Sequence, residues 1–126
     1  MAEKVTTPAK ARGSKFELDV AKYFNERGFK NVERRYGAGA TLDKGDINGL
    51  QQYGCVIECK NLAKITLSSI VNEAVAEAKN AGLPFGVSVI KKRNSGVGQS
   101  FVVMTLEQWI DFGKQGGFKA VNPCGF

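Results

Sequence analysis

Residues 55–90 read CVIECKNLAKITLSSIVNEAVAEAKNAGLPFGVSVI, and this stretch decides the fold. The run 85–90 is apolar and β-branched, which predicts a buried strand, and 55–60 predicts another. Between them, 66–81 has the pattern of an amphipathic helix with Thr66 as its N-cap. Strand, helix and strand in this order form a parallel pair with a right-handed crossover. We therefore expect an α/β protein.

The flanking segments add further elements to this unit. In chain order we expect a helix over 14–27, strands over 32–36 and 46–50, a tight turn over 51–54, a strand over 101–104 and a last helix opened by the capping pattern of Thr105 and Gln108. The Gly-rich segment 37–44 is expected to be a mobile loop. A central mixed β-sheet of about five strands, flanked by helices, follows from this order.

The length of 126 residues corresponds to one domain. Residues 1–13 include Pro8, several basic residues and little apolar content, so we expect a flexible basic arm followed by a single folded domain over 14–126. The chain has no apolar run near the ~20 residues that cross a bilayer. Its first residues also lack the apolar stretch of a signal peptide. We therefore expect an intracellular protein without a membrane partner.

The composition narrows the chemistry. Eighteen Lys and Arg against twelve Asp and Glu give a net charge of +6, which favours a polyanionic partner such as nucleic acid. The absence of histidine excludes His-based metal sites, Ser-His and Cys-His nucleophile pairs and histidine acid–base catalysis. Three cysteines, an odd number, do not form a disulfide framework. Catalysis must therefore rest on carboxylates, lysine, hydroxyls or thiols.

Two acids and a lysine converge on the predicted hairpin. Glu58 and Lys60 share one face of a strand, because side chains alternate along it, while Cys55 and Cys59 point to the other face as buried hydrophobes. The hairpin returns Asp46 beside Glu58. Paired carboxylates hold Mg²⁺, or Mn²⁺ in its place, and the ion activates water for attack on a phosphate. The lysine either orients this water, stabilises negative charge, or acts as a base if burial lowers its pKa.

Glu17 is a fourth candidate. On a helical wheel of 14–28 it lies within the apolar face, between Ala21 and Phe24. An acid aimed toward the core is costly unless it meets a cation or hydrogen-bond donors, and a metal site beside the sheet would supply that partner. The alternative is a capping box, in which Ser14 is the N-cap and Glu17, three residues later, bonds back to the N-cap backbone N–H.

The segments Gly13-Ser14-Lys15-Phe16-Glu17, Gly45-Asp46-Ile47 and Ile57-Glu58-Cys59-Lys60 together resemble the PD-(D/E)xK nuclease superfamily. Within it the chain is most similar to the archaeal-type Holliday junction resolvases and their phage relatives, over residues 12–90. One departure is Lys44, where a proline often precedes the Gly-Asp pair. The resemblance implies a restriction-endonuclease-like core and homodimers that act on branched DNA. It also implies metal binding by Asp46, Glu58 and the carbonyl of Cys59, with help from Glu17, and a catalytic Lys60.

Basic residues near these acids are candidates for contacts with DNA phosphates. They fall into three groups, each of which is otherwise a solvated surface: Lys10 and Arg12; Arg34, Arg35 and Lys44; and Lys91, Lys92 and Arg93. Glu73 and Glu77 lie on the polar side of the helix over 66–81, so we expect them to be surface charges.

The function hypothesis that follows is a Mg²⁺-dependent, structure-selective DNA endonuclease, a Holliday junction resolvase that cuts four-way or other branched DNA. A restriction-like or repair endonuclease on duplex DNA would have the same catalytic core. A non-catalytic DNA-binding module with the same fold is the alternative from another class. It fits the charge but gives no reason to place two acids near a phosphate.

Overall fold

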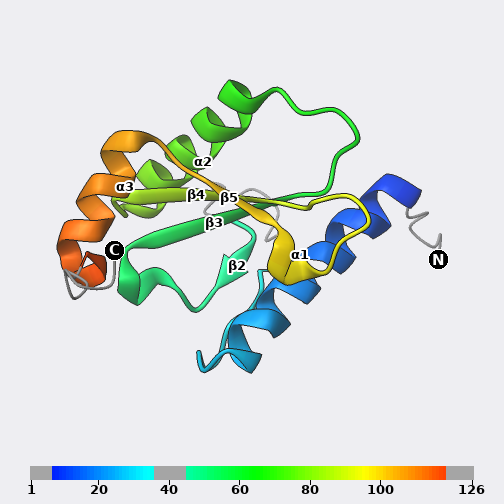
Figure 1. The fold of residues 1–126 in the computed structure, drawn as a ribbon, viewed down its shortest axis with the longest axis horizontal. Coiled ribbons are helices and arrows are strands. Elements are labelled where there is room, and N and C mark those ends of the chain that lie inside the picture. Colours follow the sequence, from blue (N-terminus) through cyan, green and yellow to red (C-terminus); the bar gives the residue numbers. More distant parts are fainter. Residues whose placement is uncertain (1–6, 36–44, 119–126) are drawn as a thin grey trace, which may run out of the picture.

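The computed structural model describes residues 7–35 and 45–118, and these form three α-helices and a five-stranded mixed sheet with helices packed against it (Figure 1). In chain order the elements are α1 Pro8–Glu26, β1 Glu33–Arg34, β2 Ile47–Asn48, η1 Gln51–Tyr53, β3 Cys55–Lys60, α2 Leu67–Ala81, β4 Phe85–Ile90, η2 Val97–Gln99, β5 Phe101–Val103, α3 Leu106–Phe112 and η3 Gly113–Gly117. The expected α/β class and element order are confirmed. None of the described helices is long and apolar enough to span a bilayer.

The sheet order is β1-β2-β3-β4-β5. The first three strands form an antiparallel meander, β4 runs parallel to β3, and β5 is antiparallel to β4. The parallel pair predicted from 55–90 is thus confirmed, with α2 as its crossover. β3 and β4 pair residue by residue along their whole length, from Cys55 opposite Phe85 to Lys60 opposite Ile90. Both strands therefore end at the same edge of the sheet.

The two faces of the sheet are covered by different helices (Figure 1). On one face, Cys55, Ile57 and Cys59 of β3 join the core with Phe16 and Val20 of α1. The other face lies against α2.

α2 packs closely on its face of the sheet. Ser88 Oγ donates a hydrogen bond to the carbonyl of Ile70, and a Cβ added at Gly86 would come within 2.2 Å of the carbonyl oxygen of Ala74. Glu58 pairs with Ser88 in register, so it shares this α2 face.

α1 begins six residues earlier than expected. Thr7 is its N-cap and accepts a hydrogen bond from the backbone N–H of Lys10, and Pro8 occupies the first turn. Proline fits there because its missing N–H would have no helical partner. The expected flexible arm over 1–13 is therefore wrong for residues 8–13, and residues 1–6 lie outside the described residues. Ser14 is consequently inside the helix, so the capping-box alternative for Glu17 is also wrong.

Candidate active site

The β2–β3 hairpin brings Asp46 to the strand that carries Glu58 and Lys60. Ile47 pairs with Ile57, and the Asp46 N–H donates to the carbonyl of Ile57 over 2.8 Å. The Asp46 carboxylate accepts a hydrogen bond from the backbone N–H of Cys59, also at 2.8 Å. Its Oδ2 therefore lies against the backbone between Glu58 and Lys60.

Gly45 makes this approach possible. Its φ of +99° favours glycine, and a Cβ at this position would come within 2.6 Å of the Val56 side chain and 3.1 Å of the Ile57 carbonyl. The Gly-Asp pair noted in the sequence thus has a local structural reason: the glycine lets the chain turn close against β3, and the aspartate then bonds to β3.

Lys60 lies between acids from two elements. Its Nζ is 3.6 Å from Glu58 Oε2 on its own strand and 3.0 Å from Glu73 Oε1 on α2. Glu58, Glu73 and Glu77 each offer a carboxylate oxygen within 4.8 Å of those of the other two. The Glu58 and Glu77 residues are only 3% exposed. Two buried carboxylates and one exposed carboxylate therefore lie close together, and two of the three, Glu58 and Glu73, pair with the Lys60 ammonium group.

The expectation that Glu73 and Glu77 are surface charges is confirmed for Glu73, which is exposed and also forms an ion pair with Lys60, and is wrong for Glu77, which is buried. Glu77 belongs to the buried stripe of α2, which also contains Ile70, Ala74 and Ala78. The spacing 70, 74, 77, 78 is a helical stripe, so the signal was present in the sequence. It was missed because a charged residue was assigned to the polar side.

The electrostatic environment keeps Lys60 charged. Burial lowers the pKa of Lys60, but its hydrogen bond with Glu73 and the charges of Glu58, Glu73 and Asp46 outweigh this effect, so the pKa is raised overall. The expectation that burial could prepare a neutral lysine base is therefore not met by the described protein. Lys60 is suited to donating hydrogen bonds and to offsetting negative charge.

The two described cysteines are neutral thiols. Burial raises the pKa of Cys55 to about 11. Burial also raises the pKa of Cys59, and the neighbouring carboxylates of Asp46, Glu17 and Glu58 raise it further against the opposing effect of Lys60. Both are free and buried, as the strand alternation predicted. Raised pKa values do not favour metal binding by a thiolate. The ligand that the resemblance implies at residue 59 is the backbone carbonyl of Cys59, which needs no thiolate.

Glu17 forms an ion pair, and its partner is Arg34. Arg34 Nε donates to Glu17 Oε2, and its Nη2 donates to Ser14 Oγ at 3.1 Å. Both charged side chains are largely buried, at 17% exposed for Glu17 and 22% for Arg34. Glu17 belongs to α1, and the acidic group of Glu58, Glu73 and Glu77 does not include it. The burial of an acid on α1 was predicted correctly, but an arginine from β1 supplies its partner.

The candidate DNA-binding residues separate into different environments. Arg12, Lys91 and Arg93 line one groove, and Lys10 and Lys92 are exposed. Arg34 is held by Glu17, and Arg35 is half-buried with its backbone N–H bonded to the carbonyl of Asp46. Lys44 lies outside the described residues. The structure therefore brings together the first and third basic groups, which are far apart in the sequence.

No family model, curated protein or solved structure matches this chain. What the fold and site define is an α/β protein in which three carboxylates and a lysine meet between a sheet and a helix, with a further aspartate bonded to the same strand.

Proposed function

We propose that this chain is a metal-dependent DNA endonuclease of the PD-(D/E)xK type, with Asp46, Glu58 and Lys60 at its active centre. The observation that carries the proposal is the Asp46 carboxylate bonded to the Cys59 N–H, with buried Glu58 and Lys60 on either side of Cys59 in one strand. Support also comes from the topology. A helix, an antiparallel three-strand meander, a crossover helix and a parallel strand follow each other, in the order the resemblance implies for a restriction-endonuclease-like core.

The donor set suits a hard divalent cation. Asp46 and Glu58 would hold Mg²⁺ through carboxylate oxygens, and the backbone carbonyl of Cys59 would join them, as the resemblance implies. Glu58, Glu73 and Glu77 bring carboxylate oxygens within 4.8 Å of one another, a donor type and spacing that suit a divalent cation. The bound ion would supply a hydroxide at neutral pH and polarise the phosphodiester.

Lys60 would act as an ammonium group. Its position between Glu58 and Glu73 keeps it protonated, so it would donate to a phosphate oxygen and stabilise charge that develops there. Glu17 would act through Arg34 rather than as a direct metal ligand. Its ion pair with Arg34 links α1 to β1, and the backbone N–H of the next residue, Arg35, donates to the carbonyl of Asp46.

The substrate we propose is branched DNA, in particular the four-way junction, cut by a homodimer. The chain's excess of basic residues fits a polyanionic substrate, and the resemblance gives the branched class. A duplex endonuclease with the same centre is the second enzyme candidate, and a non-catalytic DNA-binding module is the third possibility.

One experiment separates the three. Purified protein is incubated with a labelled four-way junction or the matching linear duplex, in Mg²⁺, in Mn²⁺ or in chelator, and its molar mass is measured by light scattering. Symmetric nicks on the junction alone, by a dimer, support the proposal. Cutting of linear duplex supports the second candidate, and binding without cutting under every metal condition supports the third.

Active-site variants test the residues. Glu58→Gln and Lys60→Ala should bind the junction but not cut it, because each removes one charged group of the proposed centre, and thermal unfolding checks that each variant is folded. Glu26→Gln is the matched control, since Glu26 is an exposed acid on α1 that pairs only loosely with Lys22 at 3.9 Å. A wild-type cutting rate in either active-site variant would remove that residue from the proposed centre.

A further inference from the structure

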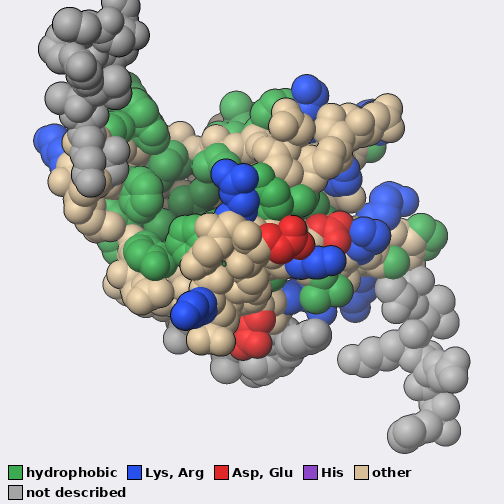
Figure 2. Space-filling view, turned by 60° about the horizontal axis from the view of Figure 1, so that its bottom comes forward, with side chains coloured by type: hydrophobic (Ala, Val, Ile, Leu, Met, Phe, Trp, Pro, Cys, Tyr) green, Lys and Arg blue, Asp and Glu red, His purple; other side chains and the backbone are tan. Residues whose placement is uncertain are grey.

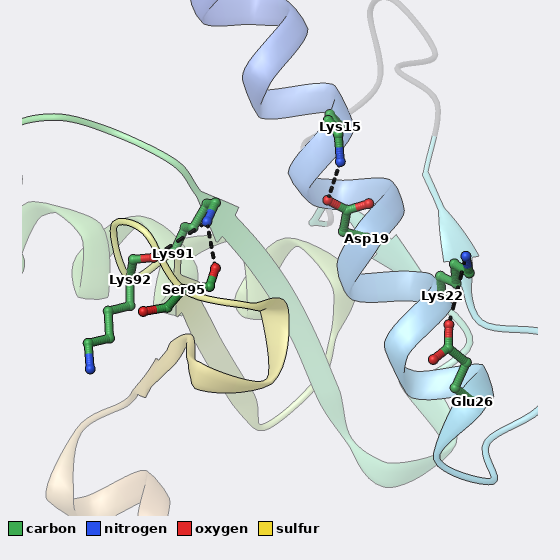
Figure 3. A network of polar contacts seen from close by, with 7 residues as sticks. All are labelled: Lys15, Asp19, Lys22, Glu26, Lys91, Lys92 and Ser95. Carbon is green, nitrogen blue, oxygen red and sulfur yellow. Dashed lines mark hydrogen bonds and ion pairs between the residues drawn. The ribbon is translucent and has the colours of Figure 1, made fainter.

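The outer side of α1 carries a row of four charged residues, Lys15, Asp19, Lys22 and Glu26, which we call the α1 charge row. At 3.6 residues per turn they lie within an arc of about 60°, on the side of the helix away from its buried residues. Their side chains are 41% to 78% exposed. Figure 3 shows the two ion pairs that they form, one after the other along the helix.

Pairing within the helix gives little reason for this row. Lys15 lies 2.8 Å from Asp19, and Lys22 lies 3.9 Å from Glu26. In both pairs the lysine precedes the acid by four residues, which is the less favourable order in a helix. Glu26 is also the last residue of α1, where a negative charge opposes the helix dipole. Exposed pairs of this kind add little stability, so a contact outside the helix would give the row a physical role.

The row is complementary to itself. Its signs alternate from positive to negative, and its spacings are four, three and four residues. Read from the other end, the spacings are the same and every sign is reversed. If a second α1 lies antiparallel, centred between residues 20 and 21, Lys15 faces the partner's Glu26 and Asp19 faces the partner's Lys22. Antiparallel copies are related by a two-fold axis, the commonest symmetry of protein dimers. A parallel copy in the same register would bring like charges together.

Apolar surface lies beside the row. A hollow of about 260 Å³ next to α1 is lined by Tyr23, Val97 and Val102 among others, and Tyr23 and Val97 also line the groove along the charge row. It adjoins a hollow of about 280 Å³ whose lining residues are all hydrophobic. Val102 lines both hollows and is 65% exposed. Figure 2 shows hydrophobic side chains gathered on the visible face, with acidic and basic side chains beside them. An apolar centre with a polar rim is typical of protein interfaces.

The charge of this surface favours a second copy of the chain as its partner. Two chains of net charge +6 repel each other over most approaches. The α1 charge row sums to zero, so two copies meet there without that repulsion. Lys91 also lines the groove along the row, but its ammonium donates to the carbonyl oxygens of Ser95 at 3.0 Å and Lys92 at 3.4 Å, which ties it to its own loop (Figure 3).

We propose that the α1 charge row and the adjoining apolar hollows form the interface between two copies of this chain, with α1 antiparallel to its copy. The choice of a second copy rests in part on the proposed function, which calls for a homodimer but names no surface for it. The apolar hollows would supply most of the affinity, and the charges would fix the register. Glu58 lies on the α2 face of the sheet, so both candidate active sites would stay open to DNA.

The test measures the mass of the full chain by light scattering and sedimentation equilibrium, without DNA. Wild type should be a dimer. Asp19→Lys sets this lysine against the partner's Lys22, and Lys22→Asp sets an acid against the partner's Asp19, so each variant alone should dimerise at least about tenfold more weakly. An equimolar mixture of the two should form heterodimers, because positions 19 and 22 then meet with opposite signs.

The double variant Asp19→Lys/Lys22→Asp separates a contact between copies from a contact within one helix. It places like charges four residues apart in both intrahelical pairs, yet it restores opposite charges across the two-fold axis. The double variant should therefore dimerise about as well as wild type. If the row acts only within its own helix, the double variant gains nothing over the single ones.

Matched controls cover both parts of the surface. Val102→Asp, which charges the rim of the hollows, should give a monomer, whereas Leu67→Asp, at a residue 53% exposed at the start of α2, should stay dimeric. Glu107→Lys makes the same charge change as Asp19→Lys at an exposed acid of α3 and should also stay dimeric. Glu26→Gln creates no like-charge contact, so the control of the cutting assay should remain a dimer. Thermal unfolding checks that each variant is folded.

The outcomes separate this interface from the proposed activity. A monomeric wild type in the high micromolar range, or a dimer indifferent to the Asp19 and Lys22 exchanges, would overturn the interface even if the protein cuts junctions. Heterodimers in the mixture and a restored double variant, without cutting in any metal, would support the interface and count against the endonuclease.

Discussion

The Lys60 ammonium lies 3.0 Å from Glu73 Oε1, an acid thirteen residues later in the chain and on a different element. Lys60 also contacts Glu58 on its own strand at 3.6 Å. If Glu58 turns toward a metal ion, Glu73 remains to hold the ammonium in place. α2 therefore contributes to the candidate site, although the strand motif alone gives no indication of it.

Removing Glu73 should slow cutting more than it affects stability. We expect Glu73→Ala to lower the single-turnover rate by about tenfold, because Lys60 loses its nearer partner. The free energy of unfolding should change by less than about 1 kcal/mol, since the Glu73 side chain is 45% exposed. Glu73→Gln, which retains an acceptor, should recover part of the rate. Wild-type cutting by Glu73→Ala would show that Glu58 alone positions the lysine.

Metal should stabilise the folded protein through the proposed ligands. An ion that binds only the folded state adds about 2.7 kcal/mol to the free energy of unfolding at a hundred times its Kd. We expect Mg²⁺ to raise the melting temperature of wild type, and to leave Asp46→Asn and Glu58→Gln unchanged. The readout needs no DNA. An equal shift in all three proteins would place the ion elsewhere.

The Lys60 environment also predicts a pH dependence. The pKa of Lys60 is raised above its ordinary value of 10.5 in the folded protein, so its ion pairs add stability that is fully present below pH 10.5 and is lost as pH rises through the folded pKa. The difference in unfolding free energy between wild type and Lys60→Met should therefore be constant at neutral pH and decline only above pH 10.5. Urea unfolding across this range measures it. A decline that begins near pH 8 would indicate a lowered pKa instead.

The buried thiols should be inert. The pKa of Cys55 is raised to about 11 and that of Cys59 is also raised, both mainly by burial, and the thiolate is the reactive form. In a Cys124→Ser background, a thiol-specific reagent at pH 8 should label neither cysteine in the folded protein and both after unfolding. Fast labelling of folded protein would mean that the α1 face of β3 opens readily.

Replacing each of two glycines with alanine should change the stability of the protein in opposite directions. A Cβ at Gly86 would meet the Ala74 carbonyl at 2.2 Å, a backbone contact that cannot move aside without shifting α2. We expect Gly86→Ala to destabilise the protein by about 3 kcal/mol. Gly13 lies inside α1 with nothing within 4 Å, so Gly13→Ala should stabilise by roughly 0.5–1 kcal/mol through helix propensity. Urea denaturation compares them, and a neutral Gly86→Ala would contradict the tight packing of α2.

Local patterns predicted much of the fold. β3 and β4 have the predicted bounds, 55–60 and 85–90, and α2 starts after Thr66 and ends before Gly82. The start of α1 was misjudged because Pro8 was treated as a mark of an arm, whereas after a Thr cap it begins a helix. Strands β1 and β2 are shorter than predicted, with two residues each, because pairing rather than composition limits them.

By itself the sequence determined the strand–helix–strand unit, the alternation that sends Glu58 and Lys60 to one face, and the Gly-Asp turn that returns to β3. These depend on neighbours within a few residues, so periodicity and turn chemistry are sufficient to predict them. Only the tertiary structure decided that Glu77 and Glu73 meet Glu58, that Arg34 satisfies Glu17, and that Arg12 lines a groove with Arg93. Each of these joins residues from separate elements, and their meeting depends on how α1 and α2 pack on opposite faces of one sheet.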